Sequence, residues 1–169
     1  MIFNLFRKSA APDAAYEAYS AIVAQSRQVQ FYALWGVPDT VTGRFDMISL
    51  HLALLLRRLR GETSARQFGQ SVVEIFFRDM DRSLREMGVT DLGVPGKVRK
   101  MGNLFYGLAA AVGQALDSAE PGALEEVLLR NIYAGAAGHE GQLAAYLRGE
   151  ADRLAAMPVA ELTAVGAPA

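Results

Sequence analysis

Two carboxylates, Asp79 and Asp81, flank a methionine in a spacing that suggests a clamp for a divalent metal ion. On a helix, however, positions i and i+2 point about 200° apart, so both groups cannot hold one ion. Asp79 instead has Arg82 at i+3, Asp81 has Arg85 at i+4, and Arg82 has Glu86 at i+4. We therefore expect an exposed helix face carrying three ion pairs, with recognition of a partner as the alternative interpretation.

A second candidate site is the glycine-containing segment at 93–97, which ends in Lys97 and precedes a helical pattern. Glycines at a helix N-terminus can bind phosphate, but the segment lacks the spacing of a nucleotide-binding loop. We interpret it as a loop-to-helix junction. Lys97, Arg99 and Lys100 form a basic cluster that suits acidic groups of a partner or phospholipid headgroups.

Catalytic and metal-binding patterns are otherwise lacking in the sequence. The chain has no cysteine and two histidines, which excludes thiolate chemistry and a three-histidine metal site. His51 lies in a leucine-rich run, where a hydrogen-bonded core histidine is the default interpretation and a pH-sensitive or ligand role the alternative. Ser26 and Ser71 have no nucleophile motif around them. We expect a protein that is not an enzyme and needs no cofactor.

Composition indicates one ordinary globular domain. The chain has 169 residues, of which 51% are hydrophobic and 21% charged, and a net charge of −1 argues against nucleic acid as a partner. The charge is nevertheless uneven, because residues 57–100 carry ten basic and six acidic groups and residues 101–169 carry three and eight. We expect either one positive and one negative face or simply solvated helix surfaces.

Apolar residues recur with helical spacing along the whole chain, and no segment alternates like a strand. The predicted fold is all-α, a single compact domain of about six to seven helices. Its helices span residues 12–34, 45–59, 63–87, 95–115, 121–132 and 143–154, with a short last turn after Pro158. The expected organisation is an N-terminal apolar and basic segment at 1–11, a helical domain at 12–164 and a tail at 165–169.

Two segments of the sequence are relevant to whether the protein spans or contacts a membrane. The uncharged window at 101–116 is shorter than the ~20 residues that a span needs, so it predicts a buried helix. The first residues are apolar and then basic, the reverse of a secretory signal, which favours a cytoplasmic bacterial protein. This segment suits peripheral contact with an anionic membrane, and a terminus that is frayed or docked on the body is the alternative. Its candidate contact residues are Ile2, Phe3, Leu5, Phe6, Arg7 and Lys8.

An aromatic cluster surrounds the loop at 36–42, which contains the predicted helix break at 36–40. Its members are Phe31, Tyr32, Trp35 and Phe45. Bulky apolar side chains next to a loop are harder to bury than those in the middle of a helix. An exposed patch here would suit an apolar partner such as a helix of a membrane protein, whereas the alternative is that the cluster caps the core.

Three blocks together resemble the ubiquinol–cytochrome c chaperone family of respiratory complex III assembly factors. They are residues 31–47 (FYALWGVPDTVTGRFDM), His51 with the leucines that run into Arg57-Arg58-Leu59-Arg60, and residues 77–95 (FRDMDRSLREMGVTDLGVP). The resemblance covers residues 16–150. It implies an all-helical, non-enzymatic protein that binds newly made cytochrome b. In mitochondria such proteins work with a second protein and near the ribosome exit, and the short start of this chain suggests a bacterial member.

On this basis we predict a client-binding groove. Its apolar lining is Phe31, Tyr32, Trp35, Phe45 and His51, and its polar contacts or walls are Arg57, Arg58, Arg78, Asp79, Asp81 and Arg82. The alternative is a helical carrier that holds a lipid, quinone or haem in the same groove, with His51 as the plausible axial ligand for haem. A third hypothesis is an enzyme whose catalytic groups are dispersed along the chain. A closed cavity would favour the carrier, and an open surface groove would favour the chaperone.

Overall fold

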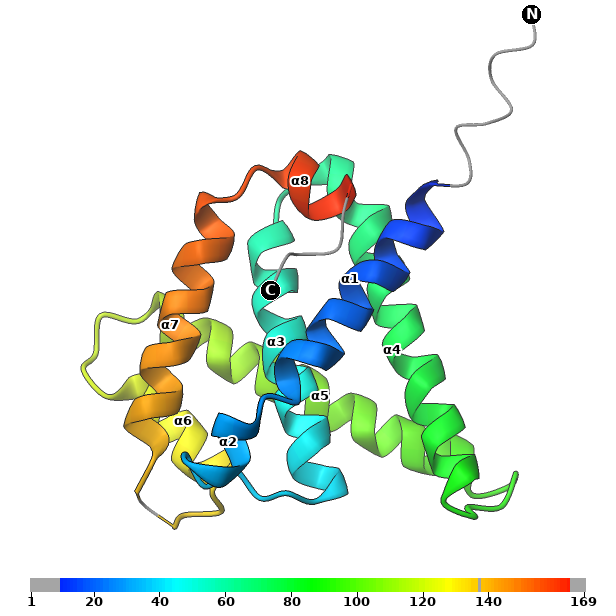
Figure 1. Cartoon of the computed structure of the whole chain (residues 1–169), viewed down its shortest axis with the longest axis horizontal. Coiled ribbons are helices and arrows are strands. Elements are labelled where there is room, and N and C mark those ends of the chain that lie inside the picture. The colour runs from blue at the N-terminus through cyan, green and yellow to red at the C-terminus, as the bar shows by residue number, and fades with distance from the viewer. Residues whose placement is uncertain (1–9, 137, 165–169) are drawn as a thin grey trace, which may run out of the picture.

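The fold is all-α, as predicted, and forms one compact domain (Figure 1). It was obtained as a computed structural model that describes residues 10–136 and 138–164. Within these residues the chain forms eight α-helices and one 3-10 helix and no strand. The elements are α1 (Ala10–Ser26), α2 (Val29–Ala33), α3 (Val41–Leu59), η1 (Thr63–Ala65), α4 (Arg66–Glu86), α5 (Val94–Asp117), α6 (Ala123–Asn131), α7 (Glu140–Ala156) and α8 (Val159–Ala164).

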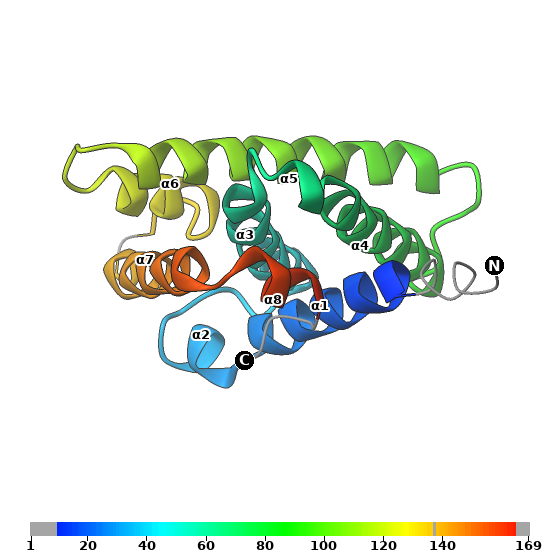
Figure 2. The same cartoon turned by 90° about the horizontal axis from the view of Figure 1, so that it is seen from above.

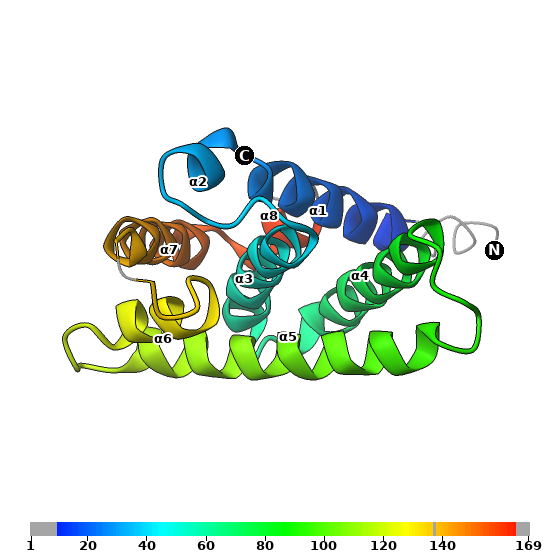
Figure 3. The same ribbon diagram turned by 90° about the horizontal axis from the view of Figure 1, so that it is seen from below.

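Helix α3 is the centre of the bundle, because it packs against α1, α4, α5 and α7. Seen from above, α5 runs along one side of the molecule and α1, α2 and α8 lie on the opposite side (Figure 2). The view from below shows α3 and α4 filling the space between these two layers, with α6 and α7 beside them (Figure 3).

Aromatic packing joins the two layers. Phe76 of α4 is almost fully buried and stacks on Phe45 of α3, with ring centroids 5.7 Å apart. Phe105 of α5 meets the same ring edge-on at 5.1 Å, and Tyr19 of α1 lies 6.3 Å from it. Each buried aromatic ring contributes a few kcal/mol to stability, so α1, α3, α4 and α5 form one core rather than separate helix pairs.

The start of α3 is fixed by its own sequence. The Thr40 hydroxyl accepts a hydrogen bond from the Gly43 amide at 3.1 Å and so caps the first turn. A Cβ atom at Gly43 would lie 1.9 Å from the Pro38 carbonyl oxygen, so only glycine lets the preceding turn fold over the helix. Arg44 adds an exposed ion pair with Asp39 at 2.8 Å. These contacts explain why the break expected at residues 36–40 is a defined turn.

Several helix details differ from the sequence prediction. The first predicted helix is divided into α1 and α2 by a turn at Arg27 and Gln28. Helix α4 begins one 3-10 turn later than expected, and no side chain caps its N-terminus. Met87, the last residue of the predicted helix 63–87, lies at the C-cap of α4 and is 52% exposed.

None of the helices in the described part of the chain combines the length and the apolarity needed to cross a membrane. The segment at 101–116 lies within α5, where Phe105, Leu108 and Val112 are buried in the core. The prediction of a buried helix holds for this face alone, because Leu104 and Tyr106 on the outer face of α5 are each 56% exposed. The proposed membrane-contacting residues Ile2, Phe3, Leu5, Phe6, Arg7 and Lys8 lie outside the described residues.

Candidate functional site

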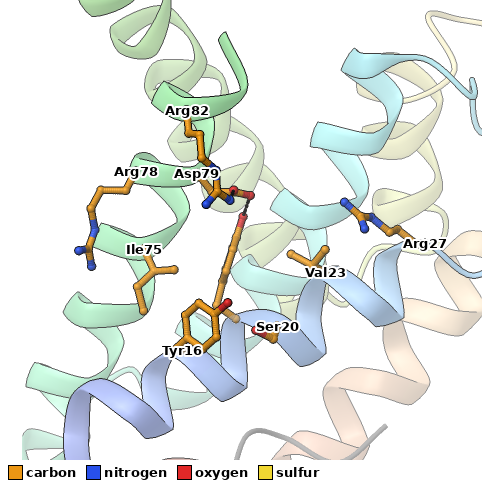
Figure 4. Close-up of a pocket in the computed structure, with 9 residues that line it drawn as sticks. Tyr16, Ser20, Val23, Arg27, Ile75, Arg78, Asp79 and Arg82 are labelled. Atoms are coloured by element: carbon orange, nitrogen blue, oxygen red, sulfur yellow. Dashed lines mark hydrogen bonds and ion pairs between the residues drawn. The ribbon is translucent and has the colours of Figure 1, made fainter. Parts of the chain in front are cut away.

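A groove with a volume of about 440 Å³ runs between α1 and α4 (Figure 4). The α1 wall repeats at intervals of four and three residues, which places its side chains on one helix face, and Arg27 in the following turn extends it. The α4 wall is a second such stripe. The lining consists of Tyr16, Ser20 and Val23 on α1, Arg27 in the turn after it, and Ile75, Arg78, Asp79 and Arg82 on α4, together with the buried Tyr19.

The centre of the groove is held by a hydrogen-bond network between the two helices. The Tyr19 hydroxyl donates to a carboxylate oxygen of Asp79 at 2.7 Å, and Arg82 pairs with the other oxygen of that carboxylate. Burial, together with the Asp79 carboxylate, raises the pKa of Tyr19 far above its usual value. The Tyr19 proton is therefore retained, and the bond fixes the spacing between α1 and α4.

The groove is electropositive. Three arginines and one aspartate line it, and the aspartate is neutralised by Arg82. Arg27 and Arg78 are exposed, and neither has a carboxylate within ion-pair distance among the residues that the structure describes. Two guanidinium groups are thus available to a negatively charged ligand.

Apolar surface accompanies this charge. Tyr16 is 63% exposed, and Val23 and Ile75 are half-buried against the core. Arg27 also lines a second hollow of about 600 Å³ beside α2, which makes the two hollows neighbours. That second hollow carries exposed Val29 and half-buried Tyr32. The combined surface suits a ligand that is apolar on one side and acidic on another.

The predicted polar residues divide between this groove and structural contacts. Arg78, Asp79 and Arg82 line the groove, and Tyr32 lines the hollow beside α2. Asp81 pairs with Arg85 at 2.6 Å and does not line it. The three ion pairs predicted from helical spacing, Asp79–Arg82, Asp81–Arg85 and Arg82–Glu86, are all present.

Arg57 and Arg58 lie away from the groove and join helices. Arg58 donates to the carbonyl oxygens of Leu154 and Met157, both at 2.9 Å, and so ties the end of α3 to the end of α7. Arg57 pairs with Asp117 at 2.5 Å and ties α3 to α5. Arg57 and Arg58 therefore hold helices together and do not line the groove.

The expectation of an exposed aromatic groove around residues 36–42 is wrong for most of its members. Phe31, Phe45 and His51 are 0%, 8% and 6% exposed and belong to the protein's own core. Trp35 is half-buried, and its ring lies 5.5 Å from that of Phe31. The cluster is covered because α7 brings Tyr146 against it, with ring centroids 5.0 Å from Phe31. The capping interpretation is therefore the one that holds here.

His51 is a hydrogen-bonded core histidine. Its Nδ1 lies 2.7 Å from the Met47 carbonyl oxygen and its Nε2 lies 2.7 Å from the Tyr146 hydroxyl. A carbonyl only accepts, so Nδ1 carries the proton and Tyr146 donates to Nε2. Gln25 donates to the Tyr146 oxygen at 2.8 Å. Burial lowers the pKa of His51, which keeps the ring neutral.

Six of the nine residues that line the groove were not among the predicted site residues: Tyr16, Tyr19, Ser20, Val23, Arg27 and Ile75. The apolar period of the predicted first helix would place Tyr16 on the buried face, yet it is 63% exposed, because Ala14, Ala15 and Ala18, together with Tyr19, make the contact with the core. Arg27 gave no signal because it lies in the turn after α1. No group of three metal-ligating side chains occurs within residues 10–136 and 138–164.

These features define an all-α protein with an open, electropositive groove between two of its helices. The profile of the ubiquinol-cytochrome C chaperone family matches residues 33–168, so the chain belongs to this family. The crystal structure of the Cbp3 homolog from Brucella abortus is 42% identical in sequence, with a TM-score of 0.86 over 97% of this chain and 93% of that one. No curated protein matches the chain. The α4 wall lies within the family match, and α1 precedes it.

Proposed function

We propose that this protein is an assembly chaperone that binds newly made cytochrome b and supports the biogenesis of ubiquinol–cytochrome c oxidoreductase, respiratory complex III. Membership of the chaperone family supports the assembly role. The structural observation that carries the binding role is the open groove between α1 and α4, which exposes apolar and cationic side chains together.

The groove suits the needs of a membrane-protein client. A newly made polytopic protein exposes apolar helices and charged loops before its partner subunits arrive. Tyr16, Val23 and Ile75 offer apolar contact to such a segment, while Arg27 and Arg78 orient it through charge. The Tyr19–Asp79 bond keeps the groove at a fixed width, so the site is formed before the client binds.

The alternative of a carrier for haem, quinone or lipid has less physical support. The hollow beside His51 has a volume of about 40 Å³, whereas ligand sites are typically several hundred Å³. Both ring nitrogens of His51 are already hydrogen-bonded, so axial ligation would break a buried bond. The larger groove is open rather than enclosed, since five of its nine lining residues are exposed, and this favours a protein segment as its ligand.

The proposed client implies where in the cell the chaperone acts. Because cytochrome b is inserted into a membrane, we place the chaperone at the cytoplasmic face of the bacterial inner membrane, in peripheral contact with it through residues 1–8. A second assembly factor is a further partner in this scheme. Ribosome proximity and nucleic-acid contact are not required by it.

The test is deletion of the gene in the source bacterium. We expect loss of assembled complex III, measured by native gel and by ubiquinol–cytochrome c reductase activity, while the other respiratory complexes stay intact. A plasmid copy of the chain should restore assembly. Normal complex III in the deletion strain, or an equal loss of all respiratory complexes, would contradict the proposal.

A further inference from the structure

The α1–α4 groove carries a charge pattern that specifies its partner more closely than the assembly role does. We propose that it binds an acidic amphipathic helix of a protein partner, with Arg27 and Arg78 contacting carboxylates and Tyr16, Val23 and Ile75 contacting the apolar stripe. This inference rests on the proposed function in that the groove is taken as the client-binding surface.

The arginines of the groove indicate an acidic ligand. Asp79 is the sole carboxylate that lines the groove among the described residues, and it is satisfied by Tyr19 and Arg82. Arg27, in the turn after α1, and Arg78, on α4, have no ion-pair partner in the described part of the chain. A guanidinium forms paired hydrogen bonds with a carboxylate, so acidic side chains are the groups that these positions best recognise.

The apolar residues exclude a simple carboxylate as the whole ligand. Tyr16 is 63% exposed at one end of the groove, and Val23 and Ile75 add apolar surface from opposite walls. A ligand that covers these side chains as well as the guanidinium groups must itself have an apolar side and an acidic side. An amphipathic helix with Asp or Glu beside its apolar stripe has this arrangement.

The shape of the surface favours a helix over a lipid membrane. The lining residues come from two helices that face each other across a hollow (Figure 4). A third helix can lie in such a hollow between two ridges. A bilayer presents a flat surface of headgroups and would bind protruding rather than recessed side chains.

The experiment uses the full chain and two fluorescent peptides of about 18 residues, long enough for several helical turns. Both carry the same leucine stripe, flanked by glutamates in one peptide and by lysines in the other. Binding is measured by fluorescence anisotropy at about 0.1 M salt, where exposed charges are partly screened. Vesicles of phosphatidylglycerol and phosphatidylcholine serve as the lipid arm and are assayed by co-sedimentation.

The variants are the double substitution R27E/R78E and, as the matched control, the double substitution R66E/R130E, which changes the net charge by the same amount. Arg66 of α4 and Arg130 of α6 are exposed, and neither lines the α1–α4 groove. Circular dichroism melting verifies that each variant is folded. We expect the glutamate peptide to bind about tenfold more tightly than the lysine peptide, R27E/R78E to remove this preference, and R66E/R130E to leave it unchanged.

Three results would overturn the inference. They are equal affinity for the two peptides, failure of both to bind, and a preference for glutamate that survives R27E/R78E in the folded variant. Loss of vesicle binding in R27E/R78E without any peptide preference would assign the groove to lipid instead. The outcome is separable from that of the gene deletion, because the peptides report groove chemistry whether or not cytochrome b is the client.

Discussion

At the residue scale, Asp46 is the clearest case of an ionisable group that opposes folding at neutral pH. It is half-buried in α3, its carboxyl oxygens have no hydrogen-bond or ion-pair partner among the described residues, and burial raises its pKa from 3.8 to about 6. The folded state therefore holds the proton more tightly than the unfolded chain. Stability from this group is full below about pH 4 and is lost as the pH rises through 6.

The substitution Asp46→Asn should accordingly stabilise the protein at about pH 7.5 by on the order of 1 kcal/mol and have little effect near pH 4. Asparagine keeps the shape of the side chain and cannot ionise. Urea unfolding of both proteins at the two pH values measures the difference. A variant that is less stable than the parent at about pH 7.5 would show that the carboxylate has a favourable partner.

His51 has the opposite effect on the pH dependence of stability, because it destabilises the folded protein as the pH falls. Because burial lowers its pKa, the unfolded chain takes up a proton first as the pH falls below about 6.5, and the folded state is destabilised. The variant His51→Gln should lose less stability between about pH 8 and pH 5.5 than the parent does. It should also be about 1–2 kcal/mol less stable at the higher pH, since the hydrogen bond from Tyr146 is impaired. Equal pH dependence of the two proteins would refute this assignment.

Single residues of the site were predictable where the rule is local. The pairing of Asp79 with Arg82 follows from helical spacing alone, and it fixes one wall of the groove. The leucine-rich run around His51 likewise indicated a core histidine, although not its hydrogen-bond partner. Burial of Phe31 was not predictable in this way, because it depends on Tyr146, more than ninety positions along the chain from either residue.

At the scale of elements, the turn before α3 makes the most specific demand on sequence. Alanine in place of a helical glycine usually stabilises by up to about 1 kcal/mol. At Gly43 the sign should reverse, because the added Cβ would lie 1.9 Å from the Pro38 carbonyl oxygen. We expect Gly43→Ala to destabilise by about 2 kcal/mol or more, measured by chemical denaturation.

Gly107 provides the matched control for this substitution. It also lies inside a helix, α5, and a Cβ there meets no atom within 4 Å. Gly107→Ala should therefore follow the usual rule and stabilise slightly. Similar effects at Gly43 and Gly107 would show that the turn at 36–40 can move away from α3, which would contradict the close contact between Gly43 and the Pro38 carbonyl group.

Helix positions were largely predictable because apolar spacing and Gly or Pro breaks are local signals. The limits of α3 and α5 are close to expectation, with Pro95 in the first turn of α5. The division between α1 and α2 was not predictable, because the apolar pattern continues through the turn at Arg27. The exposure of Tyr16 was not predictable from the apolar period either, because the core contact of α1 is made by Tyr19 and by Ala14, Ala15 and Ala18 instead.

At the scale of the whole molecule, membrane contact by the N-terminal segment stays a prediction. Removing residues 1–8 should lower co-sedimentation with anionic vesicles by about tenfold, because four bulky apolar side chains and two cations are lost. Neutral vesicles are the control and should bind both forms weakly. Unchanged sedimentation of the shortened chain would restrict any membrane proximity to the client.

The uneven charge of the sequence has a partial structural counterpart. The basic region at 57–100 includes α4, which supplies Arg78 and Arg82 to the groove. The groove itself could not be predicted, because it needs α1 and α4, which are about sixty positions apart in sequence, to lie side by side. The sequence therefore indicated a charged helix but not the hollow beside it.

The central claim is that client segments occupy the α1–α4 groove, and site-specific crosslinking tests it most directly. A photoreactive phenylalanine analogue replaces Tyr16 in the groove or, as the control, Tyr106 on α5, which is similarly exposed at 56% against 63%. The crosslinks are made in cells that are synthesising cytochrome b. We expect cytochrome b to be captured at position 16 and not at position 106, whereas capture at position 106 alone, or equally at both, would contradict the claim.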